Sequence, residues 1–183
     1  MILSNVICYL CSPVEHNQSA NWRDEFEQKI IIYGIKPLNP LKKPSWVPPE
    51  SLKMLALGDV LNNNISARSS IYDRQLCLRQ VAISDIIVVY IPSNKPFTVG
   101  VIEEVIMAKQ QNKPIYFIYK DGCPSTWLYS MFPESDIWFK NFNNFYKFLD
   151  KINNQTIKLD PIKWLFLYYK NQNFKKIKQH IWR

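Results

Sequence analysis

One segment limits the fold of this chain more than any other. Ile86-Ile87-Val88-Val89-Tyr90-Ile91 is an unbroken apolar run of β-branched and aromatic residues. Such a run without polar alternation is typical of a strand buried on both faces, as in the middle of a parallel sheet. Parallel neighbours need a crossover connection, usually a helix. The run therefore predicts an α/β protein.

Other segments alternate along the chain as such a fold requires. Apolar runs predict strands, and helical spacing between turn-forming residues predicts helices. We expect strands at 5–10, 35–38, 115–119 and 137–139, and helices at 22–33, 69–83, 99–111 and 142–152. The proline-rich stretch 40–65 reads as a long loop with one helical turn. This order predicts a single doubly wound, Rossmann-like parallel sheet of about five strands.

The length of 183 residues suits one domain with an appendage. We expect an α/β domain at 1–153 and a basic amphipathic helical tail at 154–183, with a helix at 162–182. Residues 1–139 hold 13 Lys or Arg and 13 Asp or Glu, so the net charge of +8 comes entirely from the remainder. The tail could contact nucleic acid, lie on a membrane surface, dock on a neighbouring subunit, or cover the sheet with its aromatic face.

Cysteines and apolar segments indicate a cytoplasmic protein. Cys8 and Cys11 fall in one expected strand, whose alternation points them to opposite faces and disfavours a zinc site. No run reaches the roughly 20 apolar residues of a membrane-spanning helix, and Pro13 interrupts the apolar N-terminal segment, which argues against a signal peptide. Neither histidine has a partner at metal-ligand spacing, and we expect no metal and no cofactor.

Ligands of open parallel sheets bind where the carboxyl ends of the strands meet. Three segments of this chain should gather there. They are Tyr9-Leu10-Cys11-Ser12-Pro13, the loop that leads from Pro92 to Thr98 and Gly100, and the helix start with Glu103 and Glu104.

These segments resemble, in the same order, motifs of the nucleoside 2-deoxyribosyltransferase-like family. The sequence YLCSP is similar to the family's Y-L-A-G-P and is followed by Trp22-Arg23 and Leu38-Asn39-Pro40. Tyr72-Asp73-Arg74-Gln75 and then Ser84-Asp85 before the core strand resemble a second motif. Gly100-Val101-Ile102-Glu103-Glu104, with Ala108 and Lys113-Pro114, resembles G-T-x-x-E and G-K-P. The resemblance covers residues 6 to 120.

The resemblance implies chemistry on an N-glycosidic bond. Glu104 would be the nucleophile that attacks the anomeric carbon, and Tyr9 would orient it through a hydrogen bond that keeps it ionised. Asp73 would protonate or recognise the base. Asp85 would assist, or would only bind backbone groups at the start of a strand. Because two glutamates are adjacent, Glu103 could replace Glu104 as the reactive one.

The remaining expected site residues would bind substrate. Ser12, Pro13, Thr98, Gly100 and Glu103 lie in the converging segments, and Arg23 could hold a nucleotide phosphate or form a surface salt bridge. The sequence departs from the family pattern at Val101, where the family has threonine, and at Cys11-Ser12, where it has Ala-Gly.

Two functions follow as hypotheses. The first is an enzyme, a transferase or hydrolase that cleaves nucleosides or nucleotides or transfers their (deoxy)ribosyl group. The second is a non-catalytic nucleotide-binding or sensing module whose basic tail contacts nucleic acid or a partner. The resembled family completes its active sites with a neighbouring subunit, which implies a homo-oligomer.

Overall fold

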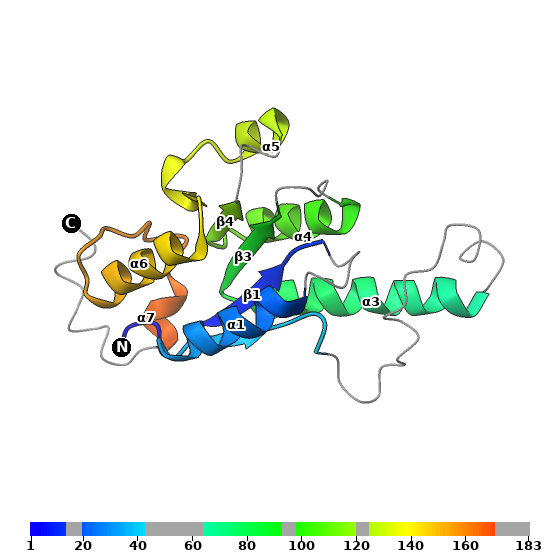
Figure 1. Ribbon diagram of the computed structural model, residues 1–183, viewed down its shortest axis with the longest axis horizontal. Helices are drawn as coiled ribbons and strands as arrows, with labels where there is room; N and C mark the ends of the chain where they lie inside the picture. Colours follow the sequence, from blue (N-terminus) through cyan, green and yellow to red (C-terminus); the bar gives the residue numbers. More distant parts are fainter. Residues whose placement is uncertain (14–19, 43–63, 93–97, 120–124, 171–183) are drawn as a thin grey trace.

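The structure is a computed structural model that describes residues 1–13, 20–42, 64–92, 98–119 and 125–170 (Figure 1). Within these ranges the chain forms one five-stranded sheet with the order β2-β1-β3-β4-β5, and every pair of neighbours is parallel. The strands are β1 (Ile7–Cys11), β2 (Lys36–Leu38), β3 (Ile86–Ile91), β4 (Ile115–Tyr119) and β5 (Trp138–Phe139). The expected doubly wound parallel sheet is confirmed.

Helices cover both faces of this sheet (Figure 1). On one face lie α1 (Ala20–Ile31), α6 (Phe142–Asn153) and α7 (Phe166–Lys170), and on the other lie α3 (Asn64–Ile83), α4 (Val99–Gln110) and α5 (Thr126–Met131). A 3-10 turn, η3 (Ser135–Ile137), precedes β5. The chain crosses on one face from β1 to β2 and on the other from β3 to β4. The sheet therefore has its topological switch point between β1 and β3.

Strand β1 supplies both hydrophobic cores. Its side chains alternate, so that Cys8 and Leu10 pack under α1 and α6, whereas Tyr9 and Cys11 pack under α3 and α4. All four are buried. This alternation directs Tyr9 and Cys11 to the same side of the sheet as the helix that carries Glu104.

The expected bounds of β3 and β4 are confirmed, and the other expected strands and helices up to residue 153 are present with shifted ends. Helix α3 begins at Asn64, five residues earlier than the sequence suggested. Helix α5 was not expected at all. It is six residues long and is capped by Ser125, whose Oγ accepts a hydrogen bond from the Leu128 N–H at 3.4 Å. Most of the expected loop at 40–65 lies outside the described residues.

The expected helix at 162–182 is wrong at its start. Residues 161–165 form turns, and α7 begins only at Phe166. The Asp160 carboxylate accepts hydrogen bonds from the backbone N–H groups of Ile162 and Lys163, at 2.8 and 3.2 Å, which fixes a tight turn before the helix. Residues 171–183 lie outside the described part of the chain.

The described part of the expected tail packs against the sheet. Leu159, Trp164 and Leu167 are buried in the core that α1 and α6 also cover. Covering the sheet was one of the four roles considered for the tail, and residues 159–167 have that role.

The N-terminal residues are held by elements from the end of the chain. Asn153, the last residue of α6, accepts hydrogen bonds through Oδ1 from the N–H groups of Ile2 and Leu3, at 3.1 and 3.3 Å. Lys170 of α7 donates to the Asn5 carbonyl at 3.2 Å. The two ends of the described fold are therefore tied together by polar contacts. None of the helices in the described ranges is long and apolar enough to cross a membrane.

Gly34 provides a test of the turn between α1 and β2. Its φ is +76°, and a Cβ placed on it would lie 2.9 Å from Ser4 Oγ and 3.0 Å from Ser4 Cα. Gly34→Ala should therefore lower the free energy of unfolding by about 1–2 kcal/mol, because it adds backbone strain and a clash. Urea denaturation followed by circular dichroism measures the change.

Gly100→Ala is the matched control. Gly100 lies in the first turn of α4, and nothing lies within 4 Å of a Cβ added there. Its stability should be unchanged or slightly higher. Equal stability of both variants and the wild type would contradict the strain assigned to Gly34.

Candidate functional site

The Glu104 carboxylate lies above the end of β1 with a hydrogen bond on each of its oxygens. The Tyr9 hydroxyl donates to Oε1 at 2.9 Å, and the Cys11 thiol donates to Oε2 at 3.0 Å. The hydrogen bond from Tyr9 is the one that the family resemblance implied. The hydrogen bond from Cys11 was not expected.

The geometry follows from the strand and helix periods. Tyr9 and Cys11 are two residues apart on β1 and so point to the same face. In α4, Glu104 stands three residues after Val101 and one before Val105, and both valines are buried against this face of the sheet. Glu104 therefore lies at the edge of the buried stripe of α4, at the carboxyl end of β1, next to the switch point.

Burial and hydrogen bonding act on the Glu104 pKa in opposite directions. Burial raises this pKa above the ordinary value of a glutamate, whereas the hydrogen bonds from Cys11 and Tyr9 and the charge of Arg23 lower it. Burial and the nearby Glu104 also raise the pKa of the Tyr9 phenol and of the Cys11 thiol well above their ordinary values. Both groups are therefore protonated donors at neutral pH.

Arg23 lies inside the protein rather than on its surface. Its side chain is 0% exposed, its Nη2 donates to the Ser12 carbonyl at 3.0 Å, and its guanidinium lies 4.9 Å from the centre of the Trp22 ring. Burial lowers the pKa of this guanidinium. The surface position considered for Arg23 is therefore wrong. The contact holds the backbone at Ser12, directly after β1, and places a positive charge near Glu104.

The structure distinguishes the two adjacent glutamates. Glu103 forms a two-pronged ion pair with Arg74 of α3, in which Nε and Oε2 are 2.8 Å apart and Nη2 pairs with Oε1. This pair is exposed, whereas Glu104 points to Tyr9 and Cys11. A step of one residue turns the side chain by about 100° around a helix, which separates the two carboxylates.

The substrate-binding residues expected around this position lie directly after β1 and at the start of α4. Ser12 and Pro13 are buried directly after β1, and the Ser12 Oγ has no hydrogen-bond partner in the described part of the structure. Thr98 is the N-cap of α4, and its Oγ1 accepts a hydrogen bond from the Val101 N–H at 3.5 Å. Gly100 is exposed in the first turn of α4.

Asp73 lies on the same face of α3 as Cys77, which is next to Tyr9. Cys77 is in hydrogen-bond contact with the Tyr9 side chain, and Asp73 precedes it by four residues, or about one helical turn. Helix α3 runs opposite to the strands and ends just before β3 begins. Asp73 therefore lies one turn further toward the carboxyl edge than Cys77, and it is half-buried.

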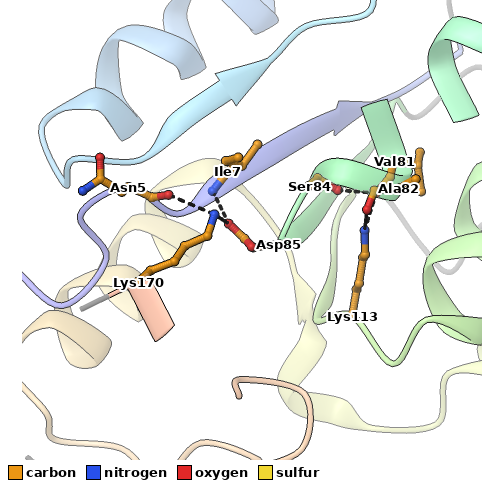
Figure 2. Close-up of polar contacts among 8 residues, drawn as sticks. All are labelled: Asn5, Ile7, Val81, Ala82, Ser84, Asp85, Lys113 and Lys170. Atoms are coloured by element: carbon orange, nitrogen blue, oxygen red, sulfur yellow. Dashed lines mark hydrogen bonds and ion pairs between the residues drawn. The ribbon is translucent and has the colours of Figure 1, made fainter. Parts of the chain in front are cut away.

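Asp85 is placed at the opposite edge of the sheet, where β1 and β3 begin (Figure 2). Its Oδ2 accepts a hydrogen bond from the Ile7 N–H at 2.6 Å and pairs with the ammonium of Lys170. The structure does not bring Asp85 together with Glu104. The alternative considered for it, binding of backbone groups at the start of a strand, is the arrangement observed.

The structure also contains a cavity of about 620 Å³ near the start of β4, which Glu104 does not line. Four lysines line it, and three of them bind neighbouring protein groups. Lys109 donates to the Met131 carbonyl at 2.7 Å, Lys113 donates to the carbonyls at the end of α3 (Figure 2), and Lys163 pairs with Glu134 at 3.6 Å. Because these ammonium groups already have partners, the cavity gives a weaker candidate site than Glu104.

No metal site is formed by the described residues, among which no group of three or more His, Cys, Asp or Glu side chains is arranged to hold an ion. Cys11 and Cys77 are the contributors to the site that the sequence did not single out. The sequence does contain a signal for Cys11. Because it is two residues from Tyr9 in the same strand, it points to the same face of the sheet and therefore toward Glu104.

No protein-family model and no curated protein sequence matches this chain. Among solved structures, it is similar to a 2-deoxyribosyltransferase from the psychrotolerant bacterium Bacillus psychrosaccharolyticus, with 17% identity, coverage of 76% of this chain and 89% of that one, and a TM-score of 0.53. It is also similar to a 2-desoxiribosyltransferase from Leishmania mexicana, with 14% identity, coverage of 79% and 97%, and a TM-score of 0.51. The chain therefore has the fold of the nucleoside 2-deoxyribosyltransferases, as the motifs suggested.

The position of Asp85 predicts a role in stability. Asp85→Asn removes the ion pair with Lys170 and weakens the hydrogen bond to Ile7, in a place where the Asp85 side chain is only 10% exposed. The free energy of unfolding should fall by about 2 kcal/mol. Asp24→Asn is the control, because its pair with Lys42 is 59% exposed on both sides and should contribute little.

Urea denaturation of both variants measures this difference. An Asp85→Asn protein as stable as the wild type would contradict the structural role. An Asp85→Asn protein that loses activity without losing stability would support a catalytic role for Asp85.

Proposed function

We propose that this chain cleaves the N-glycosidic bond of a nucleoside or nucleotide, or transfers its (deoxy)ribosyl group, with Glu104 as the nucleophile. The observation that carries the proposal is the Glu104 carboxylate held by Tyr9 and Cys11 at the switch point of the sheet. The deoxyribosyltransferase fold supports it, because the solved structures of similar fold are named for this transfer.

In the first step one oxygen of Glu104 attacks the anomeric carbon of the sugar. A carbon–oxygen ester bond forms, the carbon–nitrogen bond breaks, and its electron pair leaves with the base. The base takes up a proton from Asp73, one turn beyond Cys77 on α3, or from solvent. A carboxylate suits this step because it stabilises the positive charge that develops on the sugar.

In the second step an acceptor attacks the same carbon and restores the Glu104 carboxylate. With water the product is the free sugar, and the proton of the water passes to Asp73 or to solvent. With a second base the product is a new nucleoside, and the proton of the attacking ring nitrogen passes to Asp73 or to solvent. The two outcomes share the glycosyl-enzyme ester and differ only in which acceptor reaches it.

Groups around Glu104 would hold the substrate. The Ser12 hydroxyl, which is buried directly after β1 and has no hydrogen-bond partner in the described part of the structure, would bind a sugar hydroxyl or a phosphate oxygen. Thr98 and Gly100, at the start of α4, and Pro13, directly after β1, would contact the substrate. Glu103 would act indirectly, since its pair with Arg74 joins α4 to α3. Arg23 would act by holding the Ser12 carbonyl and lowering the Glu104 pKa.

A homo-oligomer would complete the site. The exposed face of α4 carries Val99, Ile102 and Ile106, whose side chains are 83%, 39% and 36% exposed. They follow the helical spacing i, i+3, i+7 and so form one apolar stripe beside Glu103 and Glu104. We propose that a second copy of the chain covers this stripe. We also propose that the basic tail contacts nucleic acid. The part of the tail beyond residue 170 lies outside the described residues.

Substitution of the two glutamates tests the assignment. Glu104→Gln should reduce base release from nucleosides and 5′-monophosphates by at least about a thousandfold, because an amide cannot form the ester intermediate. Glu103→Gln is the matched control and should retain activity within a fewfold. Free base is measured by chromatography, with ribo and deoxy substrates and with and without an acceptor base.

The alternatives give different results. Loss in Glu103→Gln but not in Glu104→Gln would reverse the assignment of the two glutamates. Absence of release from every substrate, together with binding of a nucleotide by calorimetry, would favour the non-catalytic binding module.

The apolar stripe on α4 predicts the assembly state. Ile106→Glu should shift the protein from oligomer to monomer, because it places a charge in an interface that excludes water. Ile31→Glu is the control, since Ile31 is 56% exposed on α1, on the other face of the sheet. Sedimentation velocity measures the mass, and a wild type that is monomeric at every concentration would exclude this interface.

A further inference from the structure

We propose that Cys11 is a positioning residue for Glu104, and that its thiol, together with the Tyr9 hydroxyl, keeps the carboxylate ionised and fixes its plane. The inference rests on the proposed function, and it adds to the site a residue that the family motif, with alanine at this position, does not supply.

The contact carries the proposal. The distance of 3.0 Å between Cys11 Sγ and Glu104 Oε2 is as short as a hydrogen bond between first-row atoms, although sulfur is larger. Tyr9 binds the other oxygen at 2.9 Å. A carboxylate held on both oxygens cannot rotate about its terminal bond without breaking one of these contacts. The orientation of the attacking lone pairs is therefore set before substrate arrives.

The protonation state of the thiol agrees with this role. A thiolate beside Glu104 would repel it and could donate nothing. Cys11 is 0% exposed, and both burial and Glu104 raise its pKa well above the ordinary value, so the thiol keeps its proton. A buried thiol of this kind is a weak nucleophile, and the chemistry stays with Glu104.

The second donor also offsets the cost of burying a negative charge. Burial favours the protonated form of Glu104, which is not nucleophilic, and the hydrogen bonds from Cys11 and Tyr9 favour the ionised form. Of these two hydrogen bonds, the one from Cys11 is the larger influence on the pKa. Removal of the thiol should therefore raise the Glu104 pKa and leave less of the reactive carboxylate at a given pH.

Cys8 provides a matched control on the same strand. It is buried like Cys11, but it points to the opposite face of β1, where its Sγ contacts the Tyr9 carbonyl at 3.9 Å. Cys8→Ala removes a buried thiol without touching Glu104. The comparison separates the loss of packing from the loss of the hydrogen bond.

The experiment compares Cys11→Ala, Cys11→Ser and Cys8→Ala with the wild type. For Cys11→Ala we expect the acidic limb of the profile of kcat/KM against pH to move to higher pH. Below that limb the activity should be about tenfold lower, the effect of losing one hydrogen bond to a charged group. Cys11→Ser should restore the wild-type profile, because a hydroxyl also donates to Oε2. Cys8→Ala should leave the limb in place.

A second readout does not depend on turnover. Carboxyl ¹³C NMR of glutamate-labelled protein, with Glu104→Gln used for assignment, gives the pKa of Glu104 directly. A higher pKa in Cys11→Ala than in Cys11→Ser supports the positioning role even if no substrate is turned over, and that combination would overturn only the proposed function. An unchanged pKa, or an equal loss of activity in the alanine and serine variants without movement of the limb, would overturn the inference.

Discussion

The parallel pairing of β1 between β2 and β3 is the constraint on which the rest of the site depends. The register places Tyr9 opposite Ile87 of β3 and Leu38 of β2, so that Tyr9 and Cys11 project on the α4 side at the carboxyl edge. A slip of one residue would exchange the two faces of the strand. It would bury Leu10 beside Glu104 and leave the carboxylate without its donors. Core packing and site chemistry are thus specified by the same alternation.

The elements predicted correctly were those with strong local patterns. The runs 86–91 and 115–119 are apolar throughout, and both strands have the expected bounds. The start of the last helix was misplaced because helical spacing of aromatic residues ignores the local competition from the Asp160 carboxylate, which fixes a turn. Helix α5 was missed because six residues carry too little periodicity to be recognised.

The candidate site was predictable only in part. A resemblance of motifs pointed to Tyr9 and Glu104, and the structure contains their hydrogen bond. The resemblance did not distinguish Glu103 from Glu104, because which of the two faces the sheet depends on how α4 is rotated against it. The resemblance also pointed to Asp85, but this residue directly precedes β3 and therefore lies at the amino edge of the sheet. A motif fixes the order of residues along the chain, whereas the edge at which each one lies depends on the direction of its element.

The polar ties between the two ends of the fold have a consequence for how the chain folds. Asn153 binds Ile2 and Leu3 across a sequence separation of about 150 residues, and Lys170 binds Asn5 across 165. The entropy of closing such loops grows only slowly with length, so the native state loses little stability by using them. The rate of folding is more sensitive, because contacts distant in sequence must wait for the rest of the chain to be ordered. During synthesis, Lys170, whose ammonium group neutralises Asp85, is made 85 residues after Asp85. Docking of α7 therefore completes the described part of the fold.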